Sequence, residues 1–233
     1  MNVLIEEAID YIEKNRASTV EVSDALGKKG AVDDVSALNA GEYAVGEIFY
    51  AATWGGSNWN LHKDIIDAPK NSVVFIDCFD CKDAVLGDVV AKYLFLYCGI
   101  SALVVNGKVR DVHRLLKEGY PIWCAGVSPV GCVNEYAELD SETEKELKKR
   151  KIMYNKSIAI CDDSGVCIVE RNKIDEDFLE KLEFIEAQED VWYYCLDVLK
   201  QNTFEIICEK KYLNDKNIIP NELYRRLKSK NDE

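Results

Sequence analysis

The sequence predicts an α/β protein with a mixed sheet, followed by a helical C-terminal extension. Strand-like apolar runs alternate with helical patterns through the middle of the chain, which is typical of a mainly parallel sheet covered by helices. Two alternating runs flank the turn residues "DDSG" in "KSIAICDDSGVCIVE", and this pattern predicts an antiparallel hairpin. Beyond about residue 172 every periodic segment is helical. We therefore expect an α/β domain over residues 1–172 and a helical extension over residues 173–233, packed on that body.

The first elements of the α/β domain are two amphipathic helices within residues 2–27. "STVE" has the form of a capping box at the start of the second helix, and Gly27 marks its end. The run "YAVGEIFYAAT" then predicts a strand, "NLHKDIIDAP" a short helix that ends at Pro69, and "SVVFIDC" a buried strand.

The next elements place an Arg-Asp pair in a suggestive position. We expect a helix from about Leu86 to Cys98, a strand over 102–105, a turn at Asn106-Gly107, a helix from about Asp111 to Lys117, and the strand "PIWCAG". Arg110 and Asp111 then lie at the carboxyl end of a strand, where open α/β sheets build their sites. Position alone leaves an alternative open, in which Asp111 complements the helix dipole and Arg110 pairs with a surface carboxylate.

Composition excludes several classes of function. The net charge of −13 argues against binding to a phosphate backbone, and no apolar run reaches the roughly 20 residues that a membrane span needs. The start of the chain, "MNVLIEEAIDYIEKN", is too acidic for a signal peptide, so we expect a cytoplasmic protein with no direct nucleic-acid or membrane partner. The nine cysteines then predict reduced, mostly buried thiols, and core filling is favoured over metal or redox chemistry for "CFDC". For His62 and His113, solvated helix positions are favoured over catalytic ones.

Several ordered blocks of the sequence resemble one family. "STVEVSDALGKKG", "GEIFYAATW", "LHKDIIDAPKNSVVFIDC", "AVLGDVVAKYLFLYCGISALVVNGKVRDVHRLLKEGYPIWCAGVSPVG" and "KSIAICDDSGVCIVE" resemble RraA-like proteins. This group includes regulator of ribonuclease E activity A and the class II 4-hydroxy-4-methyl-2-oxoglutarate aldolases. The resemblance spans roughly residues 15–172, and "LGD" and "NGKVRD" are its most specific parts. It implies a layered β/β/α fold of the swivelling-domain type, assembled as a ring, most often a trimer, with sites between subunits.

The resemblance also implies roles for particular residues. Asp111 matches the family's metal-ligating residue, and one carboxylate that leaves several waters in place suits Mg²⁺ or Mn²⁺. Arg110 matches the residue that holds the oxygens of the substrate. Asp88 matches the loop acid that orders water or moves a proton, and the amides of the segment Gly87, Asp88, Val89 and Val90 would hold a carboxylate. One departure is Arg114, which stands where some aldolases of the family carry an acid.

Two functions from different classes follow from the resemblance. The first is a metal-dependent lyase that cleaves a 4-hydroxy-2-oxo acid, decarboxylates oxaloacetate, or does both through a pyruvate enolate. The second is a non-catalytic regulator that binds a protein such as a ribonuclease. Asp111 favours the lyase, because the regulator type lacks the metal-ligating Asp. In the family another acid reaches the site from the C-terminal region of a neighbouring subunit, and no motif in this chain identifies that acid.

The C-terminal extension carries two apolar stripes that need to be buried. One follows Val191, Trp192, Cys195, Val198 and Leu199, and the other Ile219, Leu223, Tyr224 and Leu227. Residues 209–233 have a net charge of +2, which leaves −15 on residues 1–208. This contrast is the basis for expecting the extension to pack on the acidic body of its own or a neighbouring subunit.

Overall fold

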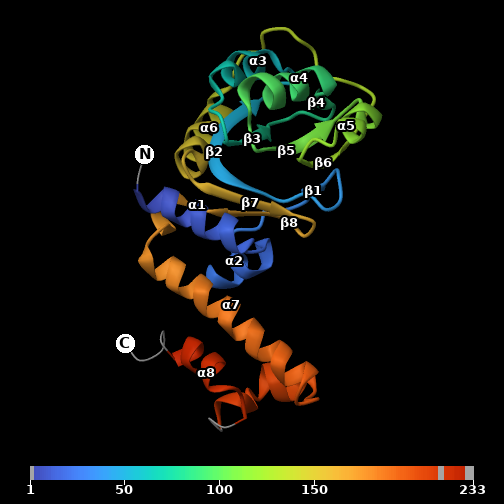
Figure 1. Cartoon of the computed structure of the whole chain (residues 1–233). Coiled ribbons are helices and arrows are strands. Elements are labelled where there is room, and N and C mark those ends of the chain that lie inside the picture. Colours follow the sequence, from blue (N-terminus) through green and yellow to red (C-terminus); the bar gives the residue numbers. More distant parts are fainter. Residues whose placement is uncertain (1–2, 215–217, 229–233) are drawn as a thin grey trace. The chain divides into compact units, whose positions relative to one another are not determined.

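The computed structural model describes residues 3–214 and 218–228, and the chain divides into two compact units, Met1–Ile174 and Asp175–Glu233. Within the first unit, the described strands form one eight-stranded mixed sheet in the order β1-β6-β5-β3-β2-β7-β8, with β4 paired to β5 (Figure 1). No helix in the described part of the chain has the length and apolar character needed to cross a membrane.

The strands of the sheet divide into a parallel centre and antiparallel flanks. Strands β2 (Ala44–Thr53), β3 (Val73–Cys78), β4 (Ala84–Leu86), β5 (Ala102–Val109) and β6 (Ile122–Val127) form the parallel part. The hairpin β7 (Ile158–Asp162) and β8 (Gly165–Val169) pairs antiparallel with the first half of β2, and the short β1 (Ser36–Ala37) pairs antiparallel with β6. Because β2 pairs with β7 through its first half and with β3 through its second, it joins the two parts of the sheet.

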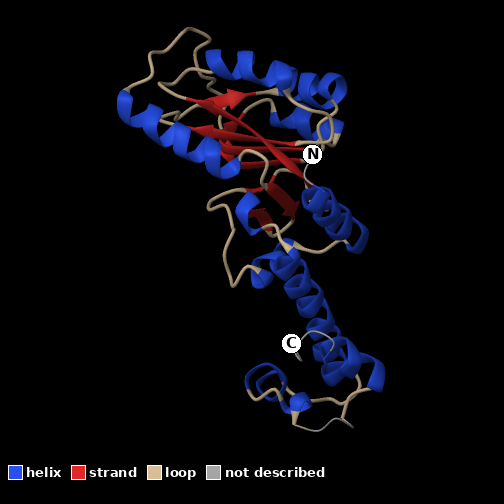
Figure 2. Ribbon diagram, turned by 90° about the vertical axis from the view of Figure 1, so that its left-hand side faces the viewer, coloured by secondary structure: helices blue, strands red, loops and turns tan. Residues whose placement is uncertain are grey.

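Helices pack beside the parallel strands (Figure 2), and an apolar layer lies on each face of the sheet. Helices α3 (Trp59–Asp64), α4 (Asp88–Tyr93) and α5 (Val112–Glu118) bury Leu61, Ala91 and Leu115 against one face of the sheet. On the other face, Phe75 and Trp123 pack between the central strands and the hairpin β7–β8. The layered β/β/α arrangement expected from the sequence is therefore confirmed.

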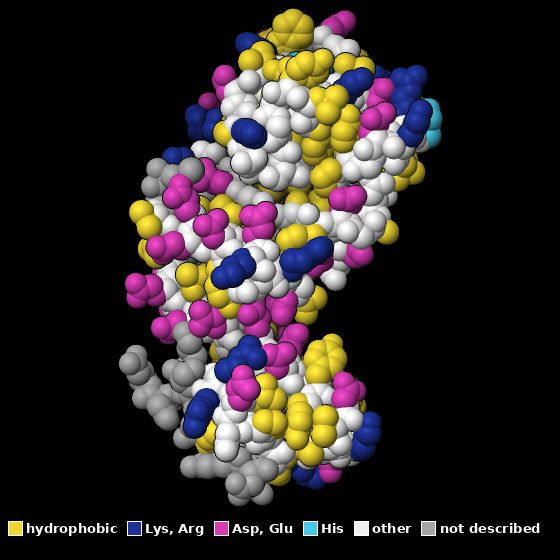
Figure 3. Space-filling model, in the orientation of Figure 1, with side chains coloured by type: hydrophobic (Ala, Val, Ile, Leu, Met, Phe, Trp, Pro, Cys, Tyr) yellow, Lys and Arg dark blue, Asp and Glu magenta, His cyan; other side chains and the backbone are white. Residues whose placement is uncertain are grey.

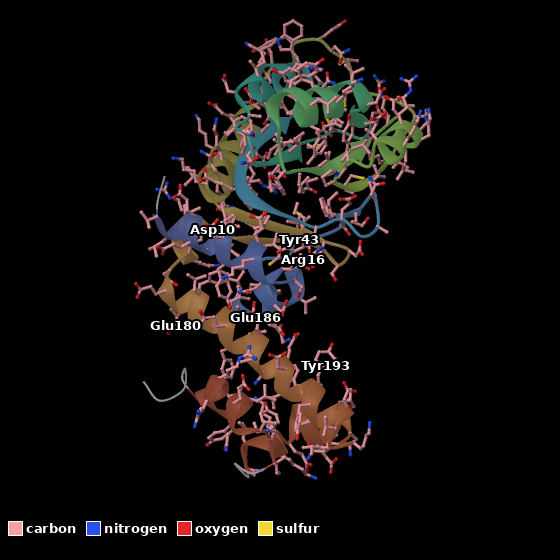
Figure 4. The ribbon with its side chains drawn as sticks, in the orientation of Figure 1. Asp10, Arg16, Tyr43, Glu180, Glu186 and Tyr193 are labelled. Atoms are coloured by element: carbon pink, nitrogen blue, oxygen red, sulfur yellow. The ribbon has the colours of Figure 1, made fainter. Side chains whose placement is uncertain are left out.

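Both predicted N-terminal helices are present, and the second begins and ends where the sequence predicts. Helix α1 spans Val3–Asn15 and α2 spans Thr19–Ala25. Ser18 caps α2 in a reciprocal capping box with Glu21, and Gly27 follows the helix at a φ of +72°. The hydroxyl of Tyr43 donates to the carbonyls of Ile12 and Ala17, and the guanidinium of Arg16 lies 5.0 Å from the centre of the Tyr43 ring (Figure 4). Burial raises the pKa of Tyr43 to about 12, so this hydroxyl remains a donor at neutral pH.

Helix α6 (Ser141–Tyr154) has no fully buried residue, and its sequence gave no helical prediction because it lacks an apolar stripe. It is held instead through a buried carboxylate on β3. Asp77 is 1% exposed and accepts hydrogen bonds from Arg150 of α6 (3.1 Å), the hydroxyl of Tyr50 (2.8 Å) and the amide of Asn106 (3.0 Å). The guanidinium of Arg150 also lies over the ring of Phe79. This cluster joins α6 to three strands of the sheet.

The predicted turn at Asn106-Gly107 is wrong. Both residues lie inside β5, which continues to Val109 through an irregularity in its pairing with β6 between Val105 and Lys108. Gly107 is required there because a Cβ atom would overlap the thiol of Cys78 on the neighbouring strand. A second difference follows β4, where Leu86 ends a strand and α4 begins only at Asp88; the predicted helical end near Cys98 is a π-helical turn, η2 (Leu94–Cys98).

The C-terminal unit is built on one long helix, α7 (Glu176–Asp197). The turns η4 (Phe204–Cys208) and η5 (Lys211–Leu213) and the helix α8 (Asn221–Lys228) follow it. The two apolar stripes bury one another within this unit, in a cluster made of Ala187, Val191, Cys195, Ile206, Tyr212, Ile219 and Leu227. Their burial therefore requires no other surface, and docking of the extension on the body stays a prediction.

Apolar side chains also remain on the surface of the C-terminal unit. Tyr193 and Leu196 on α7, and Phe204 and Ile207 on η4, are exposed. Figure 3 shows hydrophobic side chains on the surface of this unit. Val198, which the sequence pattern placed on the buried stripe, is exposed as well.

Candidate functional site

The predicted site residues meet in one pocket at the carboxyl ends of β4 and β5. Its cavity volume is about 210 Å³. Arg110 and Asp111 follow β5, while Gly87, Asp88, Val89 and Val90 form the loop and first turn that lead from β4 into α4. The structure therefore brings together all six residues that the resemblance singled out. The rest of the wall is formed by Asn58, His62, Ala84, Val85, Leu86, Gly131, Cys132 and Asn134.

Backbone hydrogen bonds and backbone conformation hold the Arg-Asp pair in place. The amide of Arg110 donates to the carbonyl of Leu86 (3.0 Å), which ties the end of β5 to β4. Asp111 adopts the left-handed conformation (φ +59°) directly before α5, and its side chain makes no capping hydrogen bond. Its carbonyl accepts from the amides of Arg114 and Leu115 instead. Since Asp111 does not cap the helix with its carboxylate, that group is available to a ligand.

Two glycines allow the Arg110 and Asp111 side chains to lie where they do. A Cβ atom on Gly87 would overlap the Oδ2 of Asp111 and lie 3.0 Å from the Cγ of Arg110. A Cβ atom on Gly131 would overlap the Nη1 of Arg110. Gly87 thus leaves room for both side chains of the Arg-Asp pair, and Gly131 leaves room for the guanidinium of Arg110.

Asp88 is paired with Arg114, the residue noted above as a departure from some aldolases of the family. The guanidinium of Arg114 donates to the Oδ2 of Asp88 at 2.8 Å. This hydrogen bond and the positive charge lower the pKa of Asp88 below its ordinary value, and Asp111 makes a smaller contribution in the same direction. A carboxylate whose pKa lies below its ordinary value orients water or a donor better than it removes a proton from an alcohol.

The donor atoms of the pocket suit a hydrated divalent cation. Among the described residues, no group of three His, Cys, Asp or Glu side chains is arranged to hold a metal ion. The side chain of Asp111 is 37% exposed, and its Oδ2 lies 3.7 Å from the Nε of Arg110. A single accessible carboxylate suits a hard cation that keeps most of its waters, such as Mg²⁺, and makes a poor zinc site. The residues present fit the expected cation.

Other residues singled out in the sequence have different surroundings. His62 lines the pocket but its side chain is exposed, while His113 lies on α5 and does not line it. Cys78 and Cys81 pack against the core, and burial raises the pKa of Cys78 to about 12, in keeping with a structural thiol. The sulfur of Cys81 lies 3.6 Å from that of Cys132.

Comparison with known proteins identifies the family. A family model described as "RraA-like: Aldolase/RraA" matches residues 19–168, which is more than half of the chain. The chain belongs to the RraA-like family. A protein of Halalkalibacterium halodurans named "Putative 4-hydroxy-4-methyl-2-oxoglutarate aldolase" is 32% identical over 126 residues, which cover 52% of this chain and 58% of that protein. Protein DlpA of Legionella pneumophila is 26% identical over 173 residues, covering 71% of this chain and 28% of DlpA. The chain thus spans little more than half of the first curated relative and about a quarter of the second.

Solved structures support the fold of this RraA-like chain. An uncharacterized protein from Pseudomonas syringae pv. tomato superposes with a TM-score of 0.65 at 20% identity, covering 86% of this chain and 96% of that one. Streptomyces coelicolor RraAS2, titled an unusual member of the RNase ES inhibitor RraA protein family, gives 0.59 at 19% identity, with 76% and 92% covered. The RNA-processing inhibitor RraA from Thermus gives 0.51 at 18% identity, with 66% and 92% covered. At these identities the likeness establishes the fold alone.

Proposed function

We propose that this chain is a divalent-metal-dependent lyase that acts on small 2-oxo acids. The observation that carries the proposal is the Arg110-Asp111 pair, which packs against Gly87 and Gly131 in a pocket of about 210 Å³. A cavity of this volume suits a ligand of a few carbon atoms. The two reactions are retro-aldol cleavage of a 4-hydroxy-2-oxo acid and decarboxylation of oxaloacetate, which share a pyruvate enolate.

In the proposed mechanism the chain binds the substrate and stabilises developing negative charge. Asp111 is the residue that would hold Mg²⁺ or Mn²⁺, and the bound cation supplies Lewis-acid polarisation of the 2-oxo group. Arg110 donates to the 2-oxo oxygen, where negative charge builds as the enolate forms. The backbone amides at the start of α4, which no side chain caps, provide donors for the carboxylate of the substrate.

The retro-aldol step balances as follows within this pocket. The C4 hydroxyl loses its proton, the C3–C4 bond breaks, and the electron pair of that bond moves into the C2–C3 enolate. The distal fragment leaves as a carbonyl compound, and the enolate takes up a proton at C3 to give pyruvate. Asp88, held in place by its hydrogen bond from Arg114, orients the water that carries the proton away from the hydroxyl.

The decisive assay measures pyruvate release with and without Mg²⁺ from oxaloacetate and from 4-hydroxy-2-oxo acids. A matched pair of glycine variants links any activity to the pocket. Gly87→Ala is expected to lower kcat/KM by about 100-fold or more, because the new methyl group displaces the Arg-Asp pair. Gly126→Ala is the control, since its Cβ atom would lie 3.7 Å from the Cγ of Lys108, an ordinary contact. Metal-independent activity, or equal activity in both variants, would refute the proposal.

The second candidate is a regulator that binds a ribonuclease, in line with the titles of the Streptomyces and Thermus proteins. Binding of a ribonuclease by a wild-type chain that releases no pyruvate would favour it.

We also propose that the α/β unit assembles as a ring, most simply a trimer. Light scattering that shows a monomer at micromolar concentration would contradict this assembly.

A further inference from the structure

Two cysteines from distant parts of the chain bring their sulfur atoms into contact beside the pocket. The thiol of Cys132 donates to the sulfur of Cys81 at 3.6 Å, although the two residues lie 51 positions apart in the sequence. Both are free thiols and only partly buried, and Cys132 lines the pocket, which admits small molecules from solvent. The two sulfurs need to approach by only about 1.6 Å to reach the length of a disulfide bond.

The segments that carry the two sulfurs are already joined by backbone hydrogen bonds. The amide of Ala84 donates to the carbonyl of Val130, and the amide of Cys132 donates to the carbonyl of Ala84, both at 2.9 Å. These bonds form a parallel bridge between Ala84 and Gly131. Cys81 lies three residues before Ala84, in the connection from β3 to β4. A disulfide between Cys81 and Cys132 would therefore link two stretches of backbone that are already paired.

The same wall of the pocket holds the guanidinium of Arg110. A Cβ atom on Gly131, the residue before Cys132, would overlap the Nη1 of Arg110, so the guanidinium packs directly against this backbone. Close packing transmits small shifts, because a group in contact has to move when the backbone that it touches moves. Closing the sulfur pair would thus displace Arg110 from the position in which it faces the pocket.

We infer that Cys81 and Cys132 are a modification site, at which a small peroxide forms a reversible disulfide that displaces Arg110. Formation of the disulfide and displacement of Arg110 are independent of the proposed lyase function. The resulting loss of pyruvate release rests on that function. The oxidant is hydrogen peroxide or another peroxide small enough to enter the pocket.

Cys81 is the sulfur that reacts first. Burial raises the pKa of Cys132 to about 12, so the Cys132 thiol keeps its proton at neutral pH and acts second. The sulfur of Cys81 attacks one oxygen of the peroxide, the O–O bond breaks, and the thiol proton leaves with the other oxygen as water, which makes Cys81 a sulfenic acid. The sulfur of Cys132 then attacks that of Cys81, and the S–O bond breaks. The departing hydroxide takes the Cys132 proton as water. One peroxide is reduced to two waters while two thiols are oxidised to one disulfide.

The direct test treats the full chain with hydrogen peroxide, blocks the remaining thiols and maps the peptides by mass spectrometry. We expect a peptide pair joined through Cys81 and Cys132, lighter by two hydrogen atoms, which dithiothreitol separates. Its yield should exceed that of any other cysteine pair about tenfold, because these two sulfurs are already in contact. Absence of the linked pair, or a mixture of unrelated pairs, would overturn the inference.

The displacement of Arg110 is measured in two ways, one of which needs no turnover. Phenylglyoxal, which reacts with accessible guanidinium groups, should label Arg110 about twofold faster or more after oxidation, since leaving Gly131 exposes the group. The kcat/KM for pyruvate release should fall about 10- to 100-fold and recover with dithiothreitol. Faster labelling in a protein that never releases pyruvate would refute only the lyase proposal. Unchanged labelling, or unchanged turnover of an active enzyme, in fully linked protein would overturn the displacement.

A matched pair of variants assigns the effect to these two sulfurs. Cys81 is not among the described residues that line the pocket, so Cys81→Ser should keep its reduced activity within about threefold of wild type and lose its sensitivity to peroxide. Cys208→Ser is the control, because Cys208 is exposed and the variant should respond to peroxide as wild type does. Inhibition of Cys81→Ser as strong as that of wild type would contradict the assignment. If Cys81→Ser fails to fold, the peptide map of the wild-type chain still decides.

Discussion

The apolar cores of the two units support different structures. In the α/β unit two apolar layers hold a sheet whose strand ends carry Arg110, Asp111 and the Gly87 loop, and the match to the RraA-like family lies wholly within this unit. In the C-terminal unit a single small cluster, centred on Val191 and Tyr212, holds one long helix and the turns that follow it. The first core holds the residues of a pocket in place. The second core buries an apolar stripe and leaves other apolar side chains exposed to solvent.

The sharpest test of this contrast is Asp111→Asn in the α/β unit. We expect loss of metal-dependent pyruvate formation by about 1,000-fold or more, because an amide is a far weaker ligand for a hard cation than a carboxylate. The melting temperature should not fall, since the carboxylate makes no capping hydrogen bond. Asp177→Asn at the start of α7 is the matched control, with activity expected to be unchanged. Retained activity in Asp111→Asn would end its assignment as the metal ligand.

The C-terminal unit should respond in stability and not in catalysis. Ile206 is 2% exposed inside the small cluster, and Ile206→Ala is expected to destabilise this unit by about 3 kcal/mol. The adjacent Ile207 is 47% exposed, so Ile207→Ala should be nearly neutral. Limited proteolysis followed by mass spectrometry measures the difference. Ile206→Ala should be cleaved faster than Ile207→Ala at sites beyond residue 174. Equal cleavage of the two variants would show that the cluster does not stabilise the unit.

A smaller change in the α/β unit separates charge from geometry. Arg110→Lys keeps the positive charge but loses the planar pair of donors, and we expect kcat/KM for pyruvate release to fall about 10- to 100-fold. Steady-state kinetics at saturating Mg²⁺ measures this loss. Lys211→Arg in the C-terminal unit provides the matched exchange in the opposite direction and should leave the rate unaffected. Wild-type kcat/KM in Arg110→Lys would show that a point charge suffices.

The smallest expected effect concerns Arg114. Its removal in Arg114→Ala takes away the main cause of the low pKa of Asp88, so that pKa should rise toward its ordinary value. Because a depressed carboxyl pKa stabilises the folded state only above that pKa, the stability lost in Arg114→Ala should be visible near neutral pH and vanish as both states become protonated in acid. Arg114 is largely exposed, so this loss should be slight. Carboxyl ¹³C NMR titration measures the pKa directly, and an unchanged value would contradict the assignment.

Sequence patterns predicted the elements whose signals are local. The Ser18–Glu21 capping box, the hairpin around "DDSG" and the buried strands appear where their residues indicate. Helix α6 was missed because it lacks an apolar stripe, although its capping Asp140 and its i,i+4 ion pairs are local helix signals. The continuation of β5 through Asn106-Gly107 was missed for a different reason. It depends on Asp77, a residue distant in sequence, whose carboxylate accepts from the amide of Asn106.

The candidate site was predictable in part. Gly87, Asp88, Arg110 and Asp111 stand in two short motifs at the ends of strands, and the structure brings them into one pocket. Asn58, Gly131 and Cys132 were missed because they come from loops whose sequence has no periodic or motif signal. Gly131 did carry a weak one, since it ends the block "VSPVG" within the resemblance. Its contact with Arg110 becomes visible only once the loop is folded over β5.

The buried Asp77 cluster has a consequence for how the sequence of this protein can vary. Helix α6 is attached to the sheet chiefly through one cation, supported by the partly buried Leu147 and Tyr154, while the rest of its surface faces solvent. Substitutions should therefore accumulate along α6 with little selection against them. Arg150 would be the exception, because its loss leaves a carboxylate inside the sheet without its counter-ion. In a comparison of many relatives, α6 should look variable around a single fixed position, and Asp77 should vary only together with it.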